Sequence, residues 1–257
     1  MTKIHPSAVI SSSALIGEDC YIGPYCIIGD HVVIGDRCRL HSHVVIDGYT
    51  TVGANNEFFP FASIGLKTQD LKWKGGITYT KIGCGNTFRE CVTVNSGTAP
   101  GESTVIGDKN LIMAYCHIAH NCVLGNEIII SNGLAMAGHV VVEDMAVISG
   151  LVTIHQFVRV GTLSIIGGSS KVNQDVPPYL MVDGNPVRAR TLNKVGLERH
   201  NISHAVQLQL KHAYRLIFRS GMAIDNAVNQ LEEEGTLLPE TEHLINFVRN
   251  SPRGVCK

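Results

Sequence analysis

Hydrophobic residues recur at every sixth position of this chain, from Ile4 to Val172. This register contains 29 positions, and 26 of them hold Ile, Val, Leu, Met or Phe. The three exceptions are Asp70, Gly76 and Pro100. A period of six residues matches neither an amphipathic helix nor a simple alternating strand. It is typical of a solenoid in which each six-residue unit places one aliphatic side chain inside.

Short strands separated by turns at this interval predict a parallel β-helix with three flat faces. Three units then form one coil, so that residues i and i+18 stack about 4.8 Å apart, the usual distance between neighbouring strands. We expect this β-helix to occupy residues 1–190.

Two interruptions of the repeat predict loops that leave the coil, near residues 67–80 and 97–104. The first is a polar, glycine-rich stretch around Asp70 and Gly76, and the second surrounds Pro100. Long loops on a regular scaffold are where binding residues concentrate, although a plain insertion would look the same in the sequence.

The last part of the chain has a helical pattern, and we expect a C-terminal helical domain over residues 191–257. Ser203 is a suitable N-cap for a helix that stops near Gly221, and Gly235 is a suitable stop for a second helix. A third helix is predicted to start near Pro239. Such helices would close the open end of the solenoid.

The overall charge is close to neutral, with a formal net charge of −1 and only 17% charged residues. This balance argues against a polybasic nucleic-acid-binding protein, so charged partners must be sought locally. Residues 199–221 contain no Asp or Glu but hold Arg199, Lys211, Arg215 and Arg219. This stretch is either a docking face for an acidic partner or a solvated surface.

Five of the eight cysteines occupy equivalent positions in the repeat, where other units carry small residues: Cys20, Cys26, Cys38, Cys116 and Cys122. They are predicted to be buried, reduced fillers and not disulfide partners. The start of the chain has no basic segment followed by an apolar stretch, and no apolar run reaches membrane-spanning length. We therefore expect a cytoplasmic protein without membrane insertion.

One edge of the predicted β-helix concentrates residues suited to acyl transfer. When every third unit is stacked, this edge brings together His117, His120, Gly138, His139, His155 and Gln156. A histidine beside a glycine N–H supplies a base for a hydroxyl proton and a donor for an oxyanion, and His120 and Gly138 are the candidates for these roles. Alternatively, the histidines occupy outward turn positions, or several of them bind zinc. Because they occupy different positions within their repeats, we expect no metal.

Several motifs, in this order, resemble those of one enzyme family. They include His-Ile-Ala-His-Asn at 117–121, Ala-Gly-His at 137–139, His-Gln-Phe at 155–157 and Asp-Val-Pro-Pro-Tyr at 175–179. The combination is similar to the acyl-[acyl-carrier-protein]–UDP-N-acetylglucosamine O-acyltransferases, hexapeptide-repeat enzymes that begin lipid A biosynthesis. The resemblance covers almost the whole chain.

This resemblance implies a homotrimer of left-handed parallel β-helices with active sites between neighbouring subunits. It implies transfer of an (R)-3-hydroxyacyl group from acyl carrier protein to the glucosamine 3-position of UDP-N-acetylglucosamine. His120 would be the general base that deprotonates the 3-hydroxyl, and the Gly138 amide would stabilise the oxyanion. The resemblance implies no cofactor and no metal.

The same resemblance assigns binding residues along the chain. The sugar and acyl contacts would be Asp70, Lys72, His117, His139, His155 and Gln156. Asn193 and Arg199 match nucleotide contacts, with Arg199 a suitable phosphate partner. The acidic helix of the carrier protein would meet the basic surface formed by Lys211, Arg215 and Arg219.

Gly168 matches the far end of the acyl groove, where a bulky side chain shortens the accepted acyl chain. Since glycine offers no obstruction, we expect a preference for a long 3-hydroxyacyl group. Alternatively, Gly167 and Gly168 form only a tight turn.

This chain departs from the family pattern at three positions. The residue after the base is often Asp, but here it is Asn121, whose neutral amide can still accept the ring N–H with weaker support for the imidazolium. Asn95 and Ser96 stand where many relatives carry His and Arg. Whether the acceptor presents a 3-hydroxyl or a 3-amine therefore stays open.

Three other functions are compatible with a hexapeptide solenoid. The first is a transferase that uses acetyl-CoA on a small amine or sugar. The second is a non-catalytic scaffold, and the third is a metal enzyme similar to carbonic anhydrase.

Overall fold

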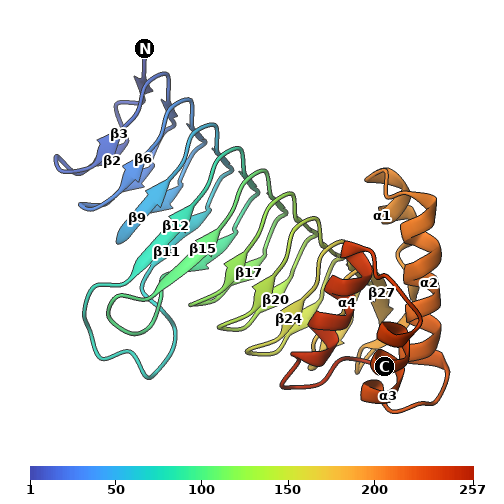
Figure 1. Cartoon of the computed structure of the whole chain (residues 1–257). Coiled ribbons are helices and arrows are strands. Elements are labelled where there is room, and N and C mark those ends of the chain that lie inside the picture. The colour runs from blue at the N-terminus through green and yellow to red at the C-terminus, as the bar shows by residue number, and fades with distance from the viewer.

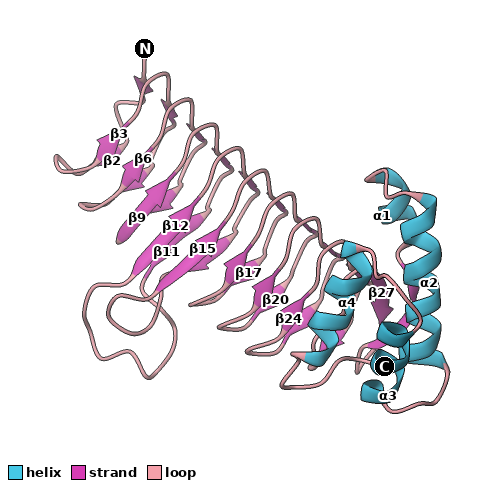
Figure 2. Ribbon diagram, viewed as in Figure 1, coloured by secondary structure: helices cyan, strands magenta, loops and turns pink.

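The computed structural model describes residues 1–257 as a three-sided prism of parallel strands with a group of helices at its C-terminal end (Figure 1). Each strand is short, and the chain then turns onto the next face, so that every third strand belongs to the same sheet. Figure 2 shows the strands stacked along the prism and the helices confined to one end.

The three faces are named here as sheets 1 to 3. Sheet 1 has eleven strands: β1 (Lys3–Ile4), β4 (Tyr21–Ile22), β7 (Arg39–Leu40), β10 (Glu57–Phe58), β13 (Thr87–Phe88), β16 (Leu111–Ile112), β19 (Ile129–Ile130), β22 (Val147–Ile148), β25 (Ile165–Ile166), β27 (Leu180–Asp183) and β28 (Arg188–Leu192). Sheet 2 has nine strands: β2 (Val9–Ile10), β5 (Ile27–Ile28), β8 (Val45–Ile46), β11 (Ser63–Leu66), β14 (Thr93–Asn95), β17 (His117–Ile118), β20 (Ala135–Met136), β23 (Thr153–Ile154) and β26 (Lys171–Val172). Sheet 3 has eight strands: β3 (Leu15–Ile16), β6 (Val33–Ile34), β9 (Tyr49–Val52), β12 (Tyr79–Ile82), β15 (Ser103–Ile106), β18 (Val123–Leu124), β21 (Val141–Val142) and β24 (Arg159–Val160).

The predicted stacking of every third six-residue unit holds along most of the prism, including the parallel pairing of β17, β20 and β23. The spacing is longer at two coils, where the sequence predicted loops. Glu57 pairs with Thr87 and not with Gly75, and Thr93 pairs with His117 and not with Leu111. The first of these coils is longer by two units and the second by one, and the extra residues leave the coil as loops.

The first loop (residues 67–78) joins β11 to β12, and the second loop (residues 96–102) joins β14 to β15. Both project from the same edge of the prism (Figure 1). Because the two insertions are whole six-residue units, the hydrophobic register continues through them in the sequence. Its three exceptions, Asp70, Gly76 and Pro100, all lie in these loops.

The aliphatic register fills the interior of the prism. Every coil position of the register from Ile22 to Val172 is at most 4% exposed, whereas Ile4, at the open N-terminal end, is 51% exposed. Burying one such side chain contributes roughly 1.5–3 kcal/mol. The five cysteines predicted as fillers are buried, and all eight cysteines are free thiols. Burial raises the pKa of the Cys122 thiol to about 12, so this thiol is unreactive at neutral pH.

Four helices follow the antiparallel β27–β28 hairpin: α1 (Lys194–Arg199), α2 (His204–Arg219), α3 (Ile224–Glu233) and α4 (Pro239–Arg249). The predicted cap of α2 is confirmed, since the Ser203 side chain accepts a hydrogen bond from the Val206 N–H. The other two predicted helices correspond to α3 and α4. None of the helices combines the length and hydrophobicity needed to cross a membrane.

The helices are anchored on the last coils of the prism. His243 Nε2 on α4 lies 2.9 Å from Glu143 Oε2, and the Arg159 guanidinium lies 4.2 Å from the centre of the Phe247 ring. The chain end adds a parallel bridge between Asp175 and Val255. The helical segment therefore covers this end of the solenoid.

Candidate active site

The corner between sheets 2 and 3 stacks one histidine, one glycine and one glutamine from successive coils. His120, Gly138 and Gln156 each stand two residues after the end of β17, β20 and β23, and these strands pair without slippage. A Cβ atom placed on Gly138 would lie 2.4 Å from His120 Cε1 and Nε2. The imidazole thus packs directly on the Gly138 backbone, and only glycine leaves room for it.

The backbone amide of Gly138 is available to a ligand. Its N–H has no acceptor within the chain, whereas the neighbouring amides of Ala137 and His139 donate to the carbonyl oxygens of Ile154 and His120. An unpaired N–H beside a base is the arrangement that stabilises an oxyanion during acyl transfer.

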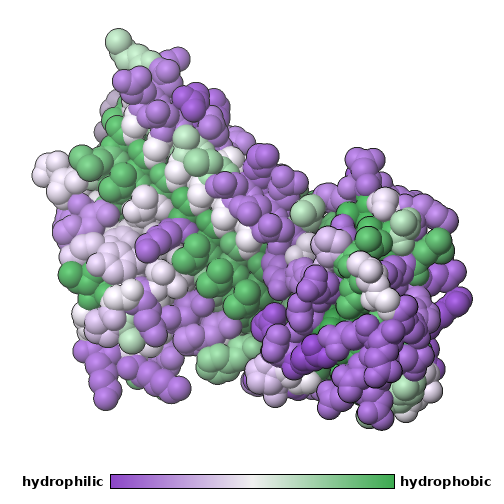
Figure 3. Space-filling view, in the orientation of Figure 1, coloured by the Kyte–Doolittle hydropathy of each residue, from purple (hydrophilic) through white to green (hydrophobic).

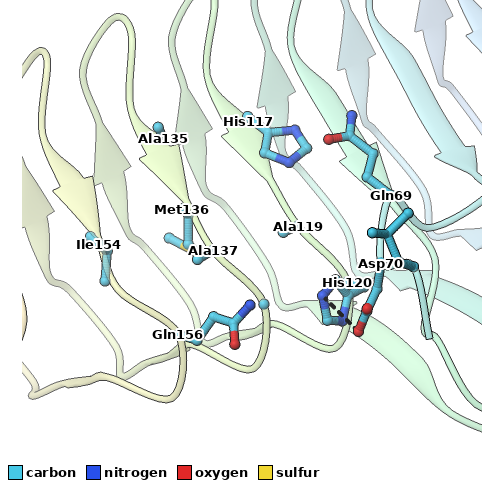
Figure 4. Close-up of a pocket in the computed structure, with 12 residues that line it drawn as sticks. Gln69, Asp70, His117, Ala119, His120, Ala135, Met136, Ala137, Ile154 and Gln156 are labelled. Atoms are coloured by element: carbon cyan, nitrogen blue, oxygen red, sulfur yellow. Dashed lines mark ion pairs between the residues drawn. The ribbon is translucent and has the colours of Figure 1, made fainter. Parts of the chain in front are cut away.

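Both ring nitrogens of His120 have polar neighbours, and the residue is only 6% exposed. Nδ1 lies 2.9 Å from Asn121 Oδ1, and Nε2 lies 3.7 Å from Asp70 Oδ2 (Figure 4). Asp70 belongs to the first loop, where its Oδ1 accepts the backbone N–H of Lys72 at 2.9 Å. The first loop therefore brings a carboxylate to the imidazole.

A cavity of about 480 Å³ lies beside the His120 ring. Figure 4 shows side chains of the first loop on one side of it and the stacked corner residues below. Its lining is half hydrophobic and consists of Gln69, Asp70, Leu71, His117, Ala119, His120, Ala135, Met136, Ala137, Gly138, Ile154 and Gln156. The mixture suits a substrate that has both a polar and an apolar part.

Two neighbouring histidines are held in the neutral state. Burial, followed by the charge of His120, lowers the pKa of His117, whose Nδ1 lies 2.8 Å from Thr93 Oγ1. Burial and then His120 also lower the pKa of His139, which meets the His120 ring edge-on with 5.2 Å between ring centres. His120 is therefore not surrounded by other cationic imidazoles at pH 7.

This chain is similar to known proteins along its whole length. A family model described as UDP-N-acetylglucosamine O-acyltransferase, domain 2, matches residues 175–256, and a model of bacterial transferase hexapeptide repeats matches residues 13–48 and 103–135. The chain is 50% identical to the acyl-[acyl-carrier-protein]–UDP-N-acetylglucosamine O-acyltransferase of Gloeothece citriformis, over 97% of this chain and 90% of that protein. It is 47% identical to the protein of the same name from Thermodesulfovibrio yellowstonii, over 100% of both. The chain belongs to the UDP-N-acetylglucosamine O-acyltransferase family.

Solved structures of this acyltransferase family share the fold. The Bacteroides fragilis UDP-N-acetylglucosamine acyltransferase superposes with a TM-score of 0.96 at 38% identity, covering 99% of this chain and 100% of that one. The Moraxella catarrhalis enzyme gives a TM-score of 0.95 at 41% identity, with 99% of each chain covered. The prediction of a left-handed parallel β-helix with a C-terminal helical segment is confirmed.

Three of the six predicted sugar and acyl contacts of this O-acyltransferase do not line the cavity. Lys72 is an exposed residue of the first loop. His139 stacks between His120 and the Phe157 ring. His155 is exposed, and its Nδ1 lies 3.2 Å from Arg253 Nη2. The cavity instead includes Gln69 and Leu71, which the sequence pattern did not single out.

Gly168 lies at the opposite edge of sheet 2, before β26. Its φ angle is outside the left-handed region, and an added Cβ would meet only the Gly150 carbonyl oxygen, at 3.4 Å. The left-handed residue of this turn is Ser169, with φ of 58°. The tight-turn alternative therefore does not explain glycine at position 168. The turn does not explain Gly167 either. A Cβ at position 167 would lie 2.7 Å from Asp183 Cβ, so glycine is needed there because of packing.

Asn193 has a structural role in this acyltransferase. Its Oδ1 accepts the Gly196 N–H at 3.0 Å and so caps α1, and its Nδ2 donates to the Leu163 carbonyl oxygen at 2.8 Å. The oxygen and the nitrogen of the Asn193 side-chain amide are therefore both bonded within the chain. This structure gives no support for the predicted contact of Asn193 with the nucleotide. Arg199, in the last turn of α1, is exposed and makes no ion pair.

One of the three basic residues predicted to meet the carrier protein also bonds within the chain. Lys211 and Arg215 are exposed on α2. The Arg219 guanidinium instead donates through Nη2 to the carbonyl oxygens of Ala189 at 3.1 Å and Arg190 at 2.7 Å. Arg219 therefore clamps α2 to β28, because the edge of that strand presents carbonyl groups to it, although the residue stays exposed and its acceptors are neutral.

The zinc alternative lacks a ligand set, since no group of three or more His, Cys, Asp or Glu side chains is arranged to hold a metal ion. The sequence pattern also missed Glu102, whose Oε2 lies 2.7 Å from Asn121 Nδ2. Glu102 belongs to the second loop, whereas Asn121 follows β17 in the next coil. The two residues are 19 positions apart, about one coil, since β15 and β18 pair at the regular spacing of 18 residues.

Proposed function

We propose that this protein transfers an (R)-3-hydroxyacyl group from acyl carrier protein to the glucosamine 3-position of UDP-N-acetylglucosamine, the reaction that begins lipid A biosynthesis. The observation that carries the proposal is the buried imidazole of His120 packed on a glycine whose amide N–H is unpaired. The two curated relatives described above are named for this activity and match 97% and 100% of the chain.

The two groups at the stacked corner supply the proton transfer and the oxyanion stabilisation. His120 Nε2 accepts the proton of the sugar hydroxyl while the hydroxyl oxygen attacks the thioester carbonyl carbon. The Gly138 N–H stabilises the resulting oxyanion. When the tetrahedral intermediate collapses, the carbon–sulfur bond breaks and the imidazolium returns its proton to the leaving thiolate. A positioned base contributes about 10²–10⁴-fold and an oxyanion donor about 10²–10³-fold.

The departures at Asn95 and Ser96 do not argue against a hydroxyl acceptor. Neither residue lines the cavity. The Asn95 Nδ2 donates to the Lys67 carbonyl oxygen at 3.0 Å, and the Ser96 N–H donates to the Leu66 carbonyl oxygen at 2.9 Å. Both residues brace the root of the first loop, so their effect on the acceptor is indirect. Parallel assays with the 3-hydroxyl and 3-amine forms of the acceptor would show which of the two the enzyme acylates.

The proposal includes a homotrimer in which a neighbouring prism completes the cavity. Figure 3 shows hydrophobic surface along the visible face of the prism. The exposed apolar side chains include Val9, Leu15, Ile27, Phe61, Tyr115, Leu151 and Phe157. Exposed apolar side chains that gather on one face are typical of a subunit interface. Light scattering should give three times the chain mass of 27.8 kDa, and a monomer mass would contradict the trimer.

Two further parts of the proposal concern the donor and the compartment. Lys211 and Arg215 supply positive charge for the acidic helix of a carrier protein. The eight free cysteines favour a reducing compartment, which supports a cytoplasmic location.

Mass spectrometry of the product tests the activity. UDP-N-acetylglucosamine is incubated with a panel of 3-hydroxyacyl carrier-protein donors and with acetyl-CoA. We expect 3-acylated product from the carrier-protein donors, a loss of at least about 100-fold for His120→Ala, and no change for the exposed control His5→Ala. Equal amounts of product from wild type and His120→Ala would contradict the role of His120 as the base. Product formed with acetyl-CoA but with none of the carrier-protein donors would contradict acyl carrier protein as the donor.

A further inference from the structure

The orientation of the Asn121 side chain is determined by two groups with unambiguous hydrogen-bonding roles. The Thr98 backbone N–H lies 3.1 Å from Oδ1, and Glu102 Oε2 lies 2.7 Å from Nδ2. A backbone amide can only donate, and an ionised carboxylate can only accept. The oxygen of Asn121 must therefore face Thr98, and its nitrogen must face Glu102.

This orientation determines the tautomer of His120. Its Nδ1 lies 2.9 Å from the same Asn121 Oδ1, which can only accept, so Nδ1 carries the proton. In the neutral imidazole the lone pair is then on Nε2. Nε2 is one of the two ring atoms nearest to Gly138, and it faces Asp70, where a base is needed.

The carboxylate behind Asn121 is itself held in place. Glu102 Oε2 also accepts the Ala99 N–H, at 2.8 Å. That bond, followed by the one from Asn121, lowers the pKa of Glu102, so the group is ionised at neutral pH. The Asn121 backbone N–H donates to Thr104 Oγ1 at 2.9 Å, so the backbone of Asn121 is held in place as well.

We propose that Glu102 is a positioning residue for acyl transfer, acting on His120 through the Asn121 amide. Its carboxylate keeps the Asn121 oxygen turned toward Nδ1, and its negative charge stabilises the imidazolium that forms when the base is protonated. This chain thereby places a negative charge one side chain away from the imidazole. The inference rests on the proposed function.

The other charged or titratable groups around His120 do not bond to its Nδ1 side. Asp70 faces Nε2, on the other side of the ring. His117 and His139 are neutral at pH 7, because burial lowers the pKa of each. Lys72 is cationic and lies on the first loop, so its charge opposes protonation of the imidazoles.

Two substitutions that rescue each other test the proposal by steady-state kinetics. Glu102→Gln removes the charge but keeps an acceptor, and we expect kcat to fall on the order of 10-fold with little change in KM. Asn121→Asp alone places a second carboxylate against Glu102, and like charges at this distance repel, so a loss of similar size is expected.

The double variant Glu102→Gln/Asn121→Asp restores one carboxylate beside Nδ1 with an amide donor behind it. We expect its kcat to recover to within about threefold of wild type, a non-additivity that a purely structural role of Glu102 would not produce. The matched control is Glu127→Gln, an exposed glutamate near Lys109 at a different corner, which should leave kcat unchanged.

Nitrogen-15 NMR of histidine-labelled protein reports the His120 tautomer without any substrate. We expect the Nδ1–H form in wild type and a mixture of tautomers in Glu102→Ala, in which the Asn121 amide can rotate. An Nε2–H form in wild type would overturn the proposal. So would an active enzyme whose Glu102 and Asn121 variants all behave like Glu127→Gln. If wild type forms no acyl product, the proposed function fails, and the NMR result still decides whether Glu102 sets the tautomer.

Discussion

Asp70 Oδ2 lies 3.7 Å from His120 Nε2, although the two residues belong to distant parts of the sequence. The contact exists because the coil that contains Asp70 is lengthened by two six-residue units, which form a loop that brings the carboxylate to the corner holding His120. A negative charge in this position favours the imidazolium form of the base.

Replacing this carboxylate should slow the reaction. We expect Asp70→Asn to lower kcat/KM by about 10-fold, since the amide keeps the shape of the side chain but not its charge. Initial rates with a saturating donor measure the effect. Asp225→Asn, on α3, is the control and should match wild type. A wild-type kcat/KM in Asp70→Asn would show that this carboxylate does not contribute to the reaction.

Adding one methyl group at Gly138 should abolish activity without unfolding the protein. The new Cβ would lie 2.4 Å from the His120 ring, so the imidazole must move away from the amide. We expect kcat to fall at least about 100-fold in Gly138→Ala. Gly150→Ala meets only the Asn132 carbonyl oxygen, at 3.3 Å, and should keep most of its activity. Thermal unfolding curves check that both variants remain folded.

A larger side chain at Gly168 should shorten the preferred acyl chain. The backbone there accepts a Cβ without strain, so Gly168→Met should fold normally. Since each buried CH₂ group is worth about 0.8 kcal/mol, blocking a few of them should change the ratio of long to short product by about 10–100-fold. Competition between donors of different length, read by mass spectrometry, measures this ratio. Unchanged chain-length selectivity would show that position 168 does not limit the length of the acyl chain.

Charge reversal on α2 should separate carrier-protein docking from catalysis. In Lys211→Glu/Arg215→Glu, we expect KM for the carrier-protein donor to rise by about 10-fold or more, with no change for a small thioester analogue. Arg219→Ala should instead lower the thermal unfolding temperature, because its guanidinium bonds the carbonyl oxygens of β28. A rise in KM with both donors would contradict a docking role.

The Glu143–His243 contact should make the docking of α4 sensitive to acid. Burial would raise the pKa of Glu143, but hydrogen bonds from His243 and Thr162 outweigh it and lower the pKa from 4.5. A lowered carboxyl pKa stabilises the fold above about pH 4.5, and this contribution is lost as the pH falls through the folded-state value. We expect Glu143→Gln to unfold about 1–2 kcal/mol more easily at pH 7. In urea titrations the difference from wild type should shrink below pH 4.5, and a constant difference would contradict this account.

Much of the architecture can be predicted from the six-residue register, because each unit buries one aliphatic side chain and the strands must stack to bury them all. The same stacking brings His120 next to Gly138 without any knowledge of the coordinates. The helices were also predictable, since Ser203 and Gly235 are residues that start and stop helices.

The sequence by itself therefore determined the prism, its helical cap and the stacked corner that holds the base, because all three depend on periodic burial and local capping. Only the tertiary structure decided the paths of the two loops. These paths bring Asp70 to His120 Nε2 and Glu102 to the Asn121 side chain, which contacts Nδ1. The tertiary structure also decided that Asn193 and Arg219 are bonded within the chain. These contacts join aperiodic segments, and their geometry depends on which donors and acceptors the folded backbone leaves unpaired.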